Sequence, residues 1–146
     1  MEVFLGGTTA EGTTWRDELI PQLEVDYFNP IVDDWTEEDY QRELEKRETC
    51  DYVLYVISPL MEGAYSIAEV VDDSNKRPNK TIFCVLEKDG IQDLNEDEED
   101  LFIEEVPTWT PAQRKSLTAV EKMVEKNGAL VLEDLLEIAD VLNSLK

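Results

Sequence analysis

The sequence predicts an α/β sandwich built around a mostly parallel sheet of four or five strands. Short and nearly continuous apolar runs, typical of strands buried on both faces, alternate along the chain with segments of helical periodicity. The 146 residues are 42% hydrophobic and 33% charged, which is enough for a real core and suits one domain. We therefore expect a single domain over residues 1–146, interrupted by an acidic excursion at about 88–110.

Four segments have the β-branched, aromatic or aliphatic composition of strands, and a shorter fifth lies near the C-terminus. The run Asp51–Ser58 is apolar over most of its length and is ended by Pro59, so we expect it to be the central strand. The other expected strands are 2–5, 25–28, 81–86 and 129–132.

Helices are predicted between these strands from caps and apolar spacing. Thr36 followed by three acidic residues is the strongest start, because its hydroxyl can cap the helix and acids favour the first turn. This helix should run to about Thr49. In the first helix, capped by Thr13 or Thr14 and running through Ile20, Pro21 sits late and is expected to introduce a kink. The other expected helices are about 14–20, 66–75, 111–126 and 135–142.

The charge balance excludes several kinds of partner. Thirteen Lys and Arg against 35 Asp and Glu give a net charge of −22, a field that repels phosphate backbones and anionic membranes. We expect no nucleic-acid and no membrane partner. Most positions from Asp93 to Glu105 are acidic, which indicates a solvated excursion with one short helix. Calcium binding is the alternative there, although no EF-hand spacing is present.

The absence of histidine limits the chemistry. A Ser-His-Asp triad, histidine general-base catalysis and the usual zinc sites are excluded within one chain, so acid–base work falls to carboxylates, Lys, Tyr or Cys. We expect no cofactor and no metal. Cys50 and Cys84 are not spaced as a redox pair, which fits a reducing compartment. No apolar run approaches roughly 20 residues and the N-terminus lacks a signal-peptide pattern, so we expect a cytoplasmic protein.

In open parallel sheets, ligands bind beyond the carboxyl ends of the strands. Gly6 and Gly7 follow the first strand and would let a ligand approach the backbone, although a plain turn is equally consistent with them. Asn29, Asp34 and Trp35 follow the second strand. An indole can cover a base or sugar and a carboxylate can accept from hydroxyls. The alternative is a helix cap by one of the two aspartates of this loop, with Trp35 in the core.

Two glutamates on successive helices are the candidate catalytic groups. Ser66 and Glu69 share one helix face directly after the central strand, among apolar neighbours that should half bury the carboxylate. The alternative is a capping box, in which Ser66 caps the helix and Glu69 reaches back. Glu43 lies on the preceding helix in a charged stretch, where a solvated helix face is the alternative.

The order of these motifs resembles the nucleoside 2-deoxyribosyltransferase-like family over most of the chain, apart from the acidic excursion. The resemblance implies a flavodoxin-like three-layer sandwich. It also implies cleavage of the N-glycosidic bond of a 2-deoxynucleoside or deoxynucleotide, with transfer of the sugar to another base or to water. The segments that carry it are VFLGG, NP followed by DDW, CDYVLYVISP, SIAEV and KSL…VEKNGALVLEDLLEIADVLNSL.

The resemblance also implies roles for individual residues. Glu69 matches the family's nucleophile, and Glu43 matches a second acid that handles the proton on the base, where family members more often carry Asp. Phe4 stands where the studied branch has a tyrosine that orients the nucleophile, and Tyr65 could substitute for it. The pocket would be lined by Gly6, Gly7, Asn29, Asp34, Trp35, Tyr65 and Ser66.

Partners follow from the same resemblance. We expect a small-molecule nucleoside or nucleotide as substrate and a homo-oligomer, with the C-terminal helix as a candidate interface. Related branches place Arg after the Asn-Pro pair, where this chain has Ile31 and Val32. Two other functions stay open: a glycohydrolase acting on NAD or another N-riboside, and a non-catalytic accessory protein that binds a nucleotide or a partner.

Overall fold

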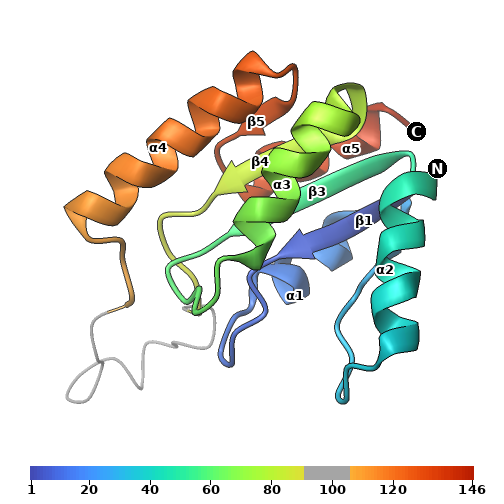
Figure 1. The fold of residues 1–146 in the computed structure, drawn as a ribbon, viewed down its shortest axis with the longest axis horizontal. Helices are drawn as coiled ribbons and strands as arrows, with labels where there is room; N and C mark the ends of the chain where they lie inside the picture. The colour runs from blue at the N-terminus through green and yellow to red at the C-terminus, as the bar shows by residue number, and fades with distance from the viewer. Residues whose placement is uncertain (91–105) are drawn as a thin grey trace.

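The computed structural model describes residues 1–90 and 106–146. In these residues five parallel strands form one sheet in the order β2-β1-β3-β4-β5, which confirms the predicted α/β sandwich of the flavodoxin-like kind (Figure 1). The expected short helix within 93–105 lies outside the described residues. The strands are β1 (Glu2–Gly7), β2 (Asp26–Phe28), β3 (Tyr52–Ile57), β4 (Thr81–Val85) and β5 (Leu130–Leu132).

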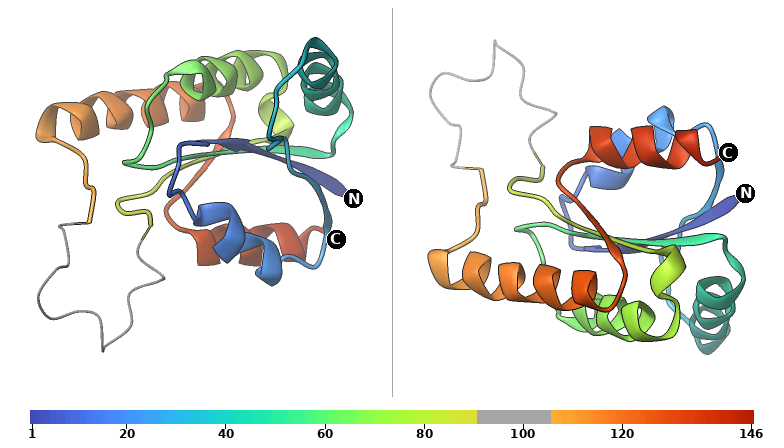
Figure 2. Two further views of the ribbon diagram at one scale, coloured as in Figure 1. Left: turned by 90° about the horizontal axis from the view of Figure 1, so that it is seen from below. Right: turned by 90° about the horizontal axis from the view of Figure 1, so that it is seen from above.

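Helices cover both faces of the sheet. Figure 2 shows α2, α3 and α4 on one face and α1 and α5 on the other, so the sheet is the middle of three layers. The described parts of the chain contain no helix with the length and apolar character needed to cross a membrane. The helices are α1 (Trp15–Leu19), α2 (Glu37–Thr49), α3 (Tyr65–Lys76), α4 (Pro111–Lys126) and α5 (Leu135–Ser144), with short 3-10 turns at Ile20–Gln22 and Pro78–Lys80.

Two apolar layers hold the sheet between the helices. Alternate residues of β1 and β3 point to opposite faces, so Leu5 and Leu54 pack towards α1 and α5 while Phe4 and Val53 pack towards α3 and α4. Both β1 and β3 are buried at nearly every position, as expected for inner strands of a parallel sheet. The central position of β3 was predicted and is confirmed.

Local signals set the helix ends with few exceptions. Thr36 and Asp39 form a reciprocal capping box at the start of α2. The first helix differs from the prediction: α1 ends at Leu19, and Pro21 belongs to a separate 3-10 turn instead of kinking a longer helix. Proline lacks the N–H that would continue the helix, and its ring fits the first positions of the tighter turn.

Candidate active site

A cavity of about 730 Å³ opens at the carboxyl ends of β1, β2 and β3, between α2 and α3. The strand order reverses between β1 and β3, and ligands of open α/β sheets bind at such a switch point. The loops that follow the three strands supply one wall each, and Glu43 and Glu69 enter from the two helices. The position of the cavity therefore agrees with the sequence prediction.

Gly6 and Gly7 form the floor of the cavity, and their lack of side chains is required there. A Cβ on Gly7 would lie 2.0 Å from the carbonyl oxygen of Val56, and the residue has a φ of +124°. A Cβ on Gly6 would lie 2.6 Å from the ring of Tyr55. The two glycines thus let β1 pass close to β3 and leave the backbone open to the cavity.

Arg16, on α1, supports this floor from the opposite face of the sheet. It was not among the residues predicted from the sequence. Its buried guanidinium donates to the carbonyl oxygens of Leu5 (2.9 Å) and Thr8 (2.7 Å). The indole of Trp15 donates to the same Thr8 oxygen at 3.0 Å. Burial lowers the pKa of Arg16 to about 9. Nothing in the sequence distinguishes this arginine from a solvated one on a short helix.

The loop after β2 places aromatic and aliphatic side chains at the mouth of the cavity. Trp35 is 56% exposed, lines the cavity and meets Tyr40 edge to face, with ring centroids 5.4 Å apart. The alternative of a core tryptophan beside an aspartate cap is therefore wrong, because Thr36 caps the helix. Asn29 accepts from the backbone N–H of Ile31, and neither it nor the exposed Asp34 is among the cavity-lining residues.

The first turn of α3 brings Tyr65, Ser66 and Glu69 to the cavity. The helix begins at Tyr65, with Ala64 at the N-cap position and no side-chain cap, so the capping-box alternative for Ser66 and Glu69 is wrong. The Glu69 side chain is only 11% exposed. It is held at the cavity wall by its place in the helix rather than by a local hydrogen bond to the helix start.

Glu43 reaches the same cavity from α2. It is half-buried, whereas its neighbours Arg42 and Glu45 are exposed, so the solvated-face alternative does not apply to this residue. Burial raises the pKa of Glu43, and a polar contact with the Trp35 side chain opposes that rise. The structure thus brings together the two glutamates that the sequence singled out.

Burial also raises the pKa of Glu69, to about 7. The positive charge of Arg47, whose Nη1 lies 3.6 Å from a carboxylate oxygen of Glu69, opposes this rise, while Glu43 and Asp73 add to it. A buried carboxyl group that titrates near neutral pH beside a second carboxyl group is an arrangement suited to acid–base or nucleophilic chemistry.

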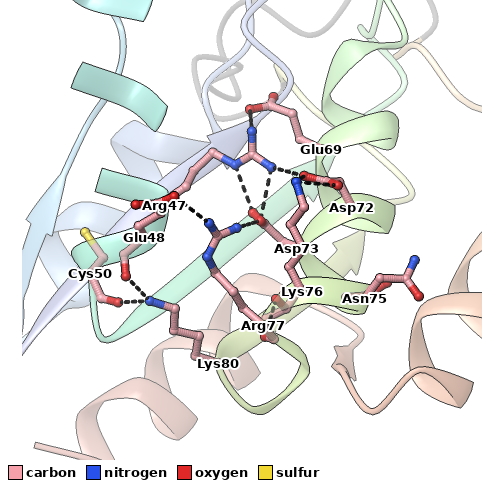
Figure 3. A network of polar contacts seen from close by, with 12 residues as sticks. Arg47, Glu48, Cys50, Glu69, Asp72, Asp73, Asn75, Lys76, Arg77 and Lys80 are labelled. Carbon is pink, nitrogen blue, oxygen red and sulfur yellow. Dashed lines mark hydrogen bonds and ion pairs between the residues drawn. The ribbon is translucent and has the colours of Figure 1, made fainter. Parts of the chain in front are cut away.

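A buried ion-pair network lies directly behind Glu69, and the sequence analysis missed it too. Arg47 of α2 contacts three acidic residues of α3, namely Glu69, Asp72 and Asp73 (Figure 3). In the sequence Arg47 is one of several charges on α2, so spacing alone does not separate it from solvated neighbours. Among the residues that the structure describes, no group of three or more Cys, Asp or Glu side chains could hold a metal ion.

Fold and cavity define the class: a flavodoxin-like α/β protein with an acidic pocket at the β1–β3 switch point. The family described as nucleoside 2-deoxyribosyltransferase like matches residues 1–88, which is more than half of the chain. The chain therefore belongs to this family, and the predicted resemblance is confirmed over those residues. The match covers β1 to β4 and every residue that lines the cavity. No curated protein matches the chain significantly.

Proposed function

We propose that the protein cleaves the N-glycosidic bond of a (2-deoxy)nucleoside or nucleotide and passes the sugar to another base or to water. The observation that carries the proposal is the meeting of Glu43 and Glu69, from successive helices, in one cavity. Membership of a nucleoside 2-deoxyribosyltransferase-like family supports this class of enzyme. A cavity of about 730 Å³ is within the usual range for small-molecule sites.

In the first step the ionised Glu69 attacks the anomeric carbon of the sugar, and the C–N bond breaks with its electron pair going to the base. Glu43, the second carboxyl group of the cavity, donates its proton to the departing base. The product is a glycosyl ester on Glu69 and a free neutral base. Positive charge that builds on the sugar is stabilised by the carboxylate, as in glycoside hydrolysis.

In the second step an incoming base or a water molecule attacks the same carbon and displaces Glu69 as a carboxylate. Glu43, now ionised, takes the proton from the attacking group and returns to its starting state. Two displacements at one carbon retain its configuration. No step requires histidine, which the chain lacks.

The rest of the cavity suits a nucleoside. The exposed ring of Trp35, packed against Tyr40, is placed to cover a base at the mouth. Ser66 and Tyr65 offer hydroxyl groups from α3, and the backbone at Gly6 and Gly7 offers a floor without side chains. Asn29 and Asp34 lie in the loop after β2, outside the cavity lining, and their contribution to substrate binding stays a prediction, as does assembly as a homo-oligomer.

The test is to mix the protein with deoxynucleosides and a free base and to resolve the products by chromatography. We expect base exchange or hydrolysis, with turnover lowered at least about 10³-fold by Glu69→Gln. Glu45→Gln, which neutralises an exposed acid of α2 outside the cavity lining, is the matched control and should retain activity. Wild-type turnover by Glu69→Gln would overturn the nucleophile assignment.

The same panel separates the alternatives. Release of nicotinamide from NAD without turnover of deoxynucleosides would show that the protein is a glycohydrolase acting on NAD or another N-riboside. Tight binding of a nucleoside without any product would assign a non-catalytic role. Either result would overturn the proposed reaction.

A further inference from the structure

The two candidate catalytic carboxylates come from different helices, so their mutual placement depends on what fixes α2 relative to α3. Helix α2 has little apolar surface for that purpose. Among its residues, all of which the structure describes, Arg47 is the one that is buried. An amphipathic helix is ordinarily held by an apolar stripe. Here a charged side chain occupies the buried position.

The guanidinium of Arg47 binds α3 through several hydrogen bonds. Its Nε and Nη2 donate to the two carboxylate oxygens of Asp73, both at 3.0 Å, in the parallel geometry that arginine makes with a carboxylate. Nη2 also donates to Asp72 at 3.0 Å. The remaining nitrogen, Nη1, lies 3.6 Å from Glu69 (Figure 3). One planar group therefore binds three successive acidic positions along α3.

Asp73 is itself held by the sheet, so the contact between Arg47 and Asp73 has a defined position. It is fully buried, and Tyr55 on the central strand β3 donates its hydroxyl to Asp73 at 2.5 Å. Arg77, the C-cap residue of α3, also donates to Asp73. The orientation of Arg47 is thereby tied to the middle of the sheet.

Because of the spacing along the two helices, this contact fixes the position of Glu43 relative to Glu69. Arg47 follows Glu43 by four residues on α2, and Asp73 follows Glu69 by four residues on α3. Residues four apart share one helix face, one turn above the other. The bond between Arg47 and Asp73 therefore lies one turn behind the pair of glutamates that lines the cavity.

We propose that Arg47 is a positioning residue for Glu69: hydrogen-bonded to Asp73 and Asp72, it orients the Glu69 carboxylate towards the cavity and stabilises its ionised form. The catalytic meaning of this role rests on the proposed function, whereas the contact itself does not. Lysine could not replace it, because a single ammonium cannot make the parallel bonds to Asp73 and still face Glu69. Phe4, on the strand beside the cavity, has no polar atom to offer Glu69.

Several ionisable groups face Glu69 and would contribute to its titration. Arg47 and Glu43 do so from α2, Asp73 and Tyr65 from α3, and Tyr55 from β3. Among these Arg47 supplies the positive charge, so its removal has an effect of known sign. The pKa of Glu69 must rise when Arg47 becomes neutral.

The first measurement leaves Arg47 unchanged and needs only the wild type and Glu69→Gln, a variant in which Arg47 keeps Asp72 and Asp73 as partners. NMR signals of the Arg47 and Arg77 side-chain nitrogens are followed against pH, together with the carboxyl carbon of Glu69, assigned by its loss in Glu69→Gln. We expect the Arg47 signal to move with the same midpoint as Glu69 and to lose that movement in Glu69→Gln, while Arg77 does not follow it. An Arg47 signal whose chemical shift does not change as Glu69 titrates would overturn the proposal.

The second measurement compares Arg47→Gln with Arg77→Gln, a matched control that also removes a partner of Asp73 but does not contact Glu69. We expect Arg47→Gln to raise the pKa of Glu69 by about one pH unit or more, and Arg77→Gln to leave it in place. The acid limb of the kcat/KM profile should move by the same amount. An unchanged Glu69 titration in Arg47→Gln would refute the positioning role. The carboxyl titration needs no substrate, so it decides this point even if no nucleoside is turned over.

Discussion

Replacing Glu69 with glutamine is expected to stabilise the folded protein at neutral and alkaline pH while it removes activity. The wild-type carboxyl group is nearly enclosed, and burial raises its pKa to about 7 against an ordinary value of 4.5. Glutamine has a similar shape and no charge to bury. Arg47 keeps two carboxylate partners, Asp72 and Asp73, when the charge of Glu69 is lost, so the substitution leaves no buried cation unpaired.

The magnitude follows from the two pKa values. Below pH 4.5 the carboxyl group is protonated in both the folded and the unfolded protein and contributes no pH dependence. Between pH 4.5 and about 7 the unfolded chain releases the proton and the folded protein retains it, so stability falls as pH rises. At about 1.4 kcal/mol per pH unit the total is about 3 kcal/mol, which stays lost above pH 7. The glutamine variant does not lose this amount.

Urea denaturation at a series of pH values from 5 to 8 measures the effect. The stability of Glu69→Gln minus that of the wild type should grow by about 2.5 kcal/mol between those limits, since part of the loss precedes pH 5, and then level off. Glu62→Gln, at an exposed position of the same cavity, should differ from the wild type by less than about 0.5 kcal/mol throughout. A variant that is equally destabilised at pH 5 and pH 8 would show that Glu69 acts as a structural partner of Arg47.

Three further substitutions and one control test the surroundings of the site, each by urea denaturation. Gly7→Ala should lower the free energy of unfolding by more than about 2 kcal/mol, because its φ is +124° and the new Cβ would lie 2.0 Å from a carbonyl oxygen of β3. Gly63→Ala, in open space, should change it by less than about 0.5 kcal/mol. Asp89→Asn should cost about 1–3 kcal/mol, because this buried carboxylate accepts from three side-chain hydroxyls and a backbone N–H. Tyr55→Phe should cost about 2 kcal/mol by removing the hydroxyl that donates to Asp73 at 2.5 Å.

Each of these expectations has a contrary outcome. A Gly7→Ala variant as stable as the wild type would mean that β1 can move away from β3. An Asp89→Asn variant of unchanged stability would mean that this side chain does not tie the end of β4 to the loop after β1 and the end of β3. If Tyr55→Phe unfolds at the same urea concentration as the wild type, its hydroxyl does not contribute to fixing Asp73.

The strands and helices could be predicted because their signals are local. A buried parallel strand needs an unbroken apolar run, and Tyr52–Ile57 provides one. The start of α2 follows from Thr36 and Asp39, whose reciprocal bonds join residues three apart. Pro21 shows the limit of such signals. The sequence predicted a kinked helix here, and the structure instead has a helix that ends at Leu19 and a separate 3-10 turn at Ile20–Gln22.

For the site, the sequence indicated candidate residues, but it could not decide whether each of them has a structural or a functional role. The capping-box alternative for Ser66 and Glu69 satisfied every local rule, yet the N-cap of α3 is Ala64, two residues before Ser66, and both side chains line the cavity. The sequence also left undecided whether Trp35 lies in the core or is exposed at the cavity. Its indole is outside the core because the loop after β2 runs past the cavity mouth, which no short-range pattern specifies.

By itself the sequence determined the alternation of strands and helices, and with it the edge of the sheet at which a ligand must bind, because hydrophobic periodicity and caps act over a few residues. Only the tertiary structure decided which of the many charged residues matter. Arg47 and Asp73 lie 26 positions apart, and they meet because both helices pack on the same face of the sheet. The energy of a charge depends on its burial and its partners rather than on its neighbours in sequence, so that choice is made when the chain folds.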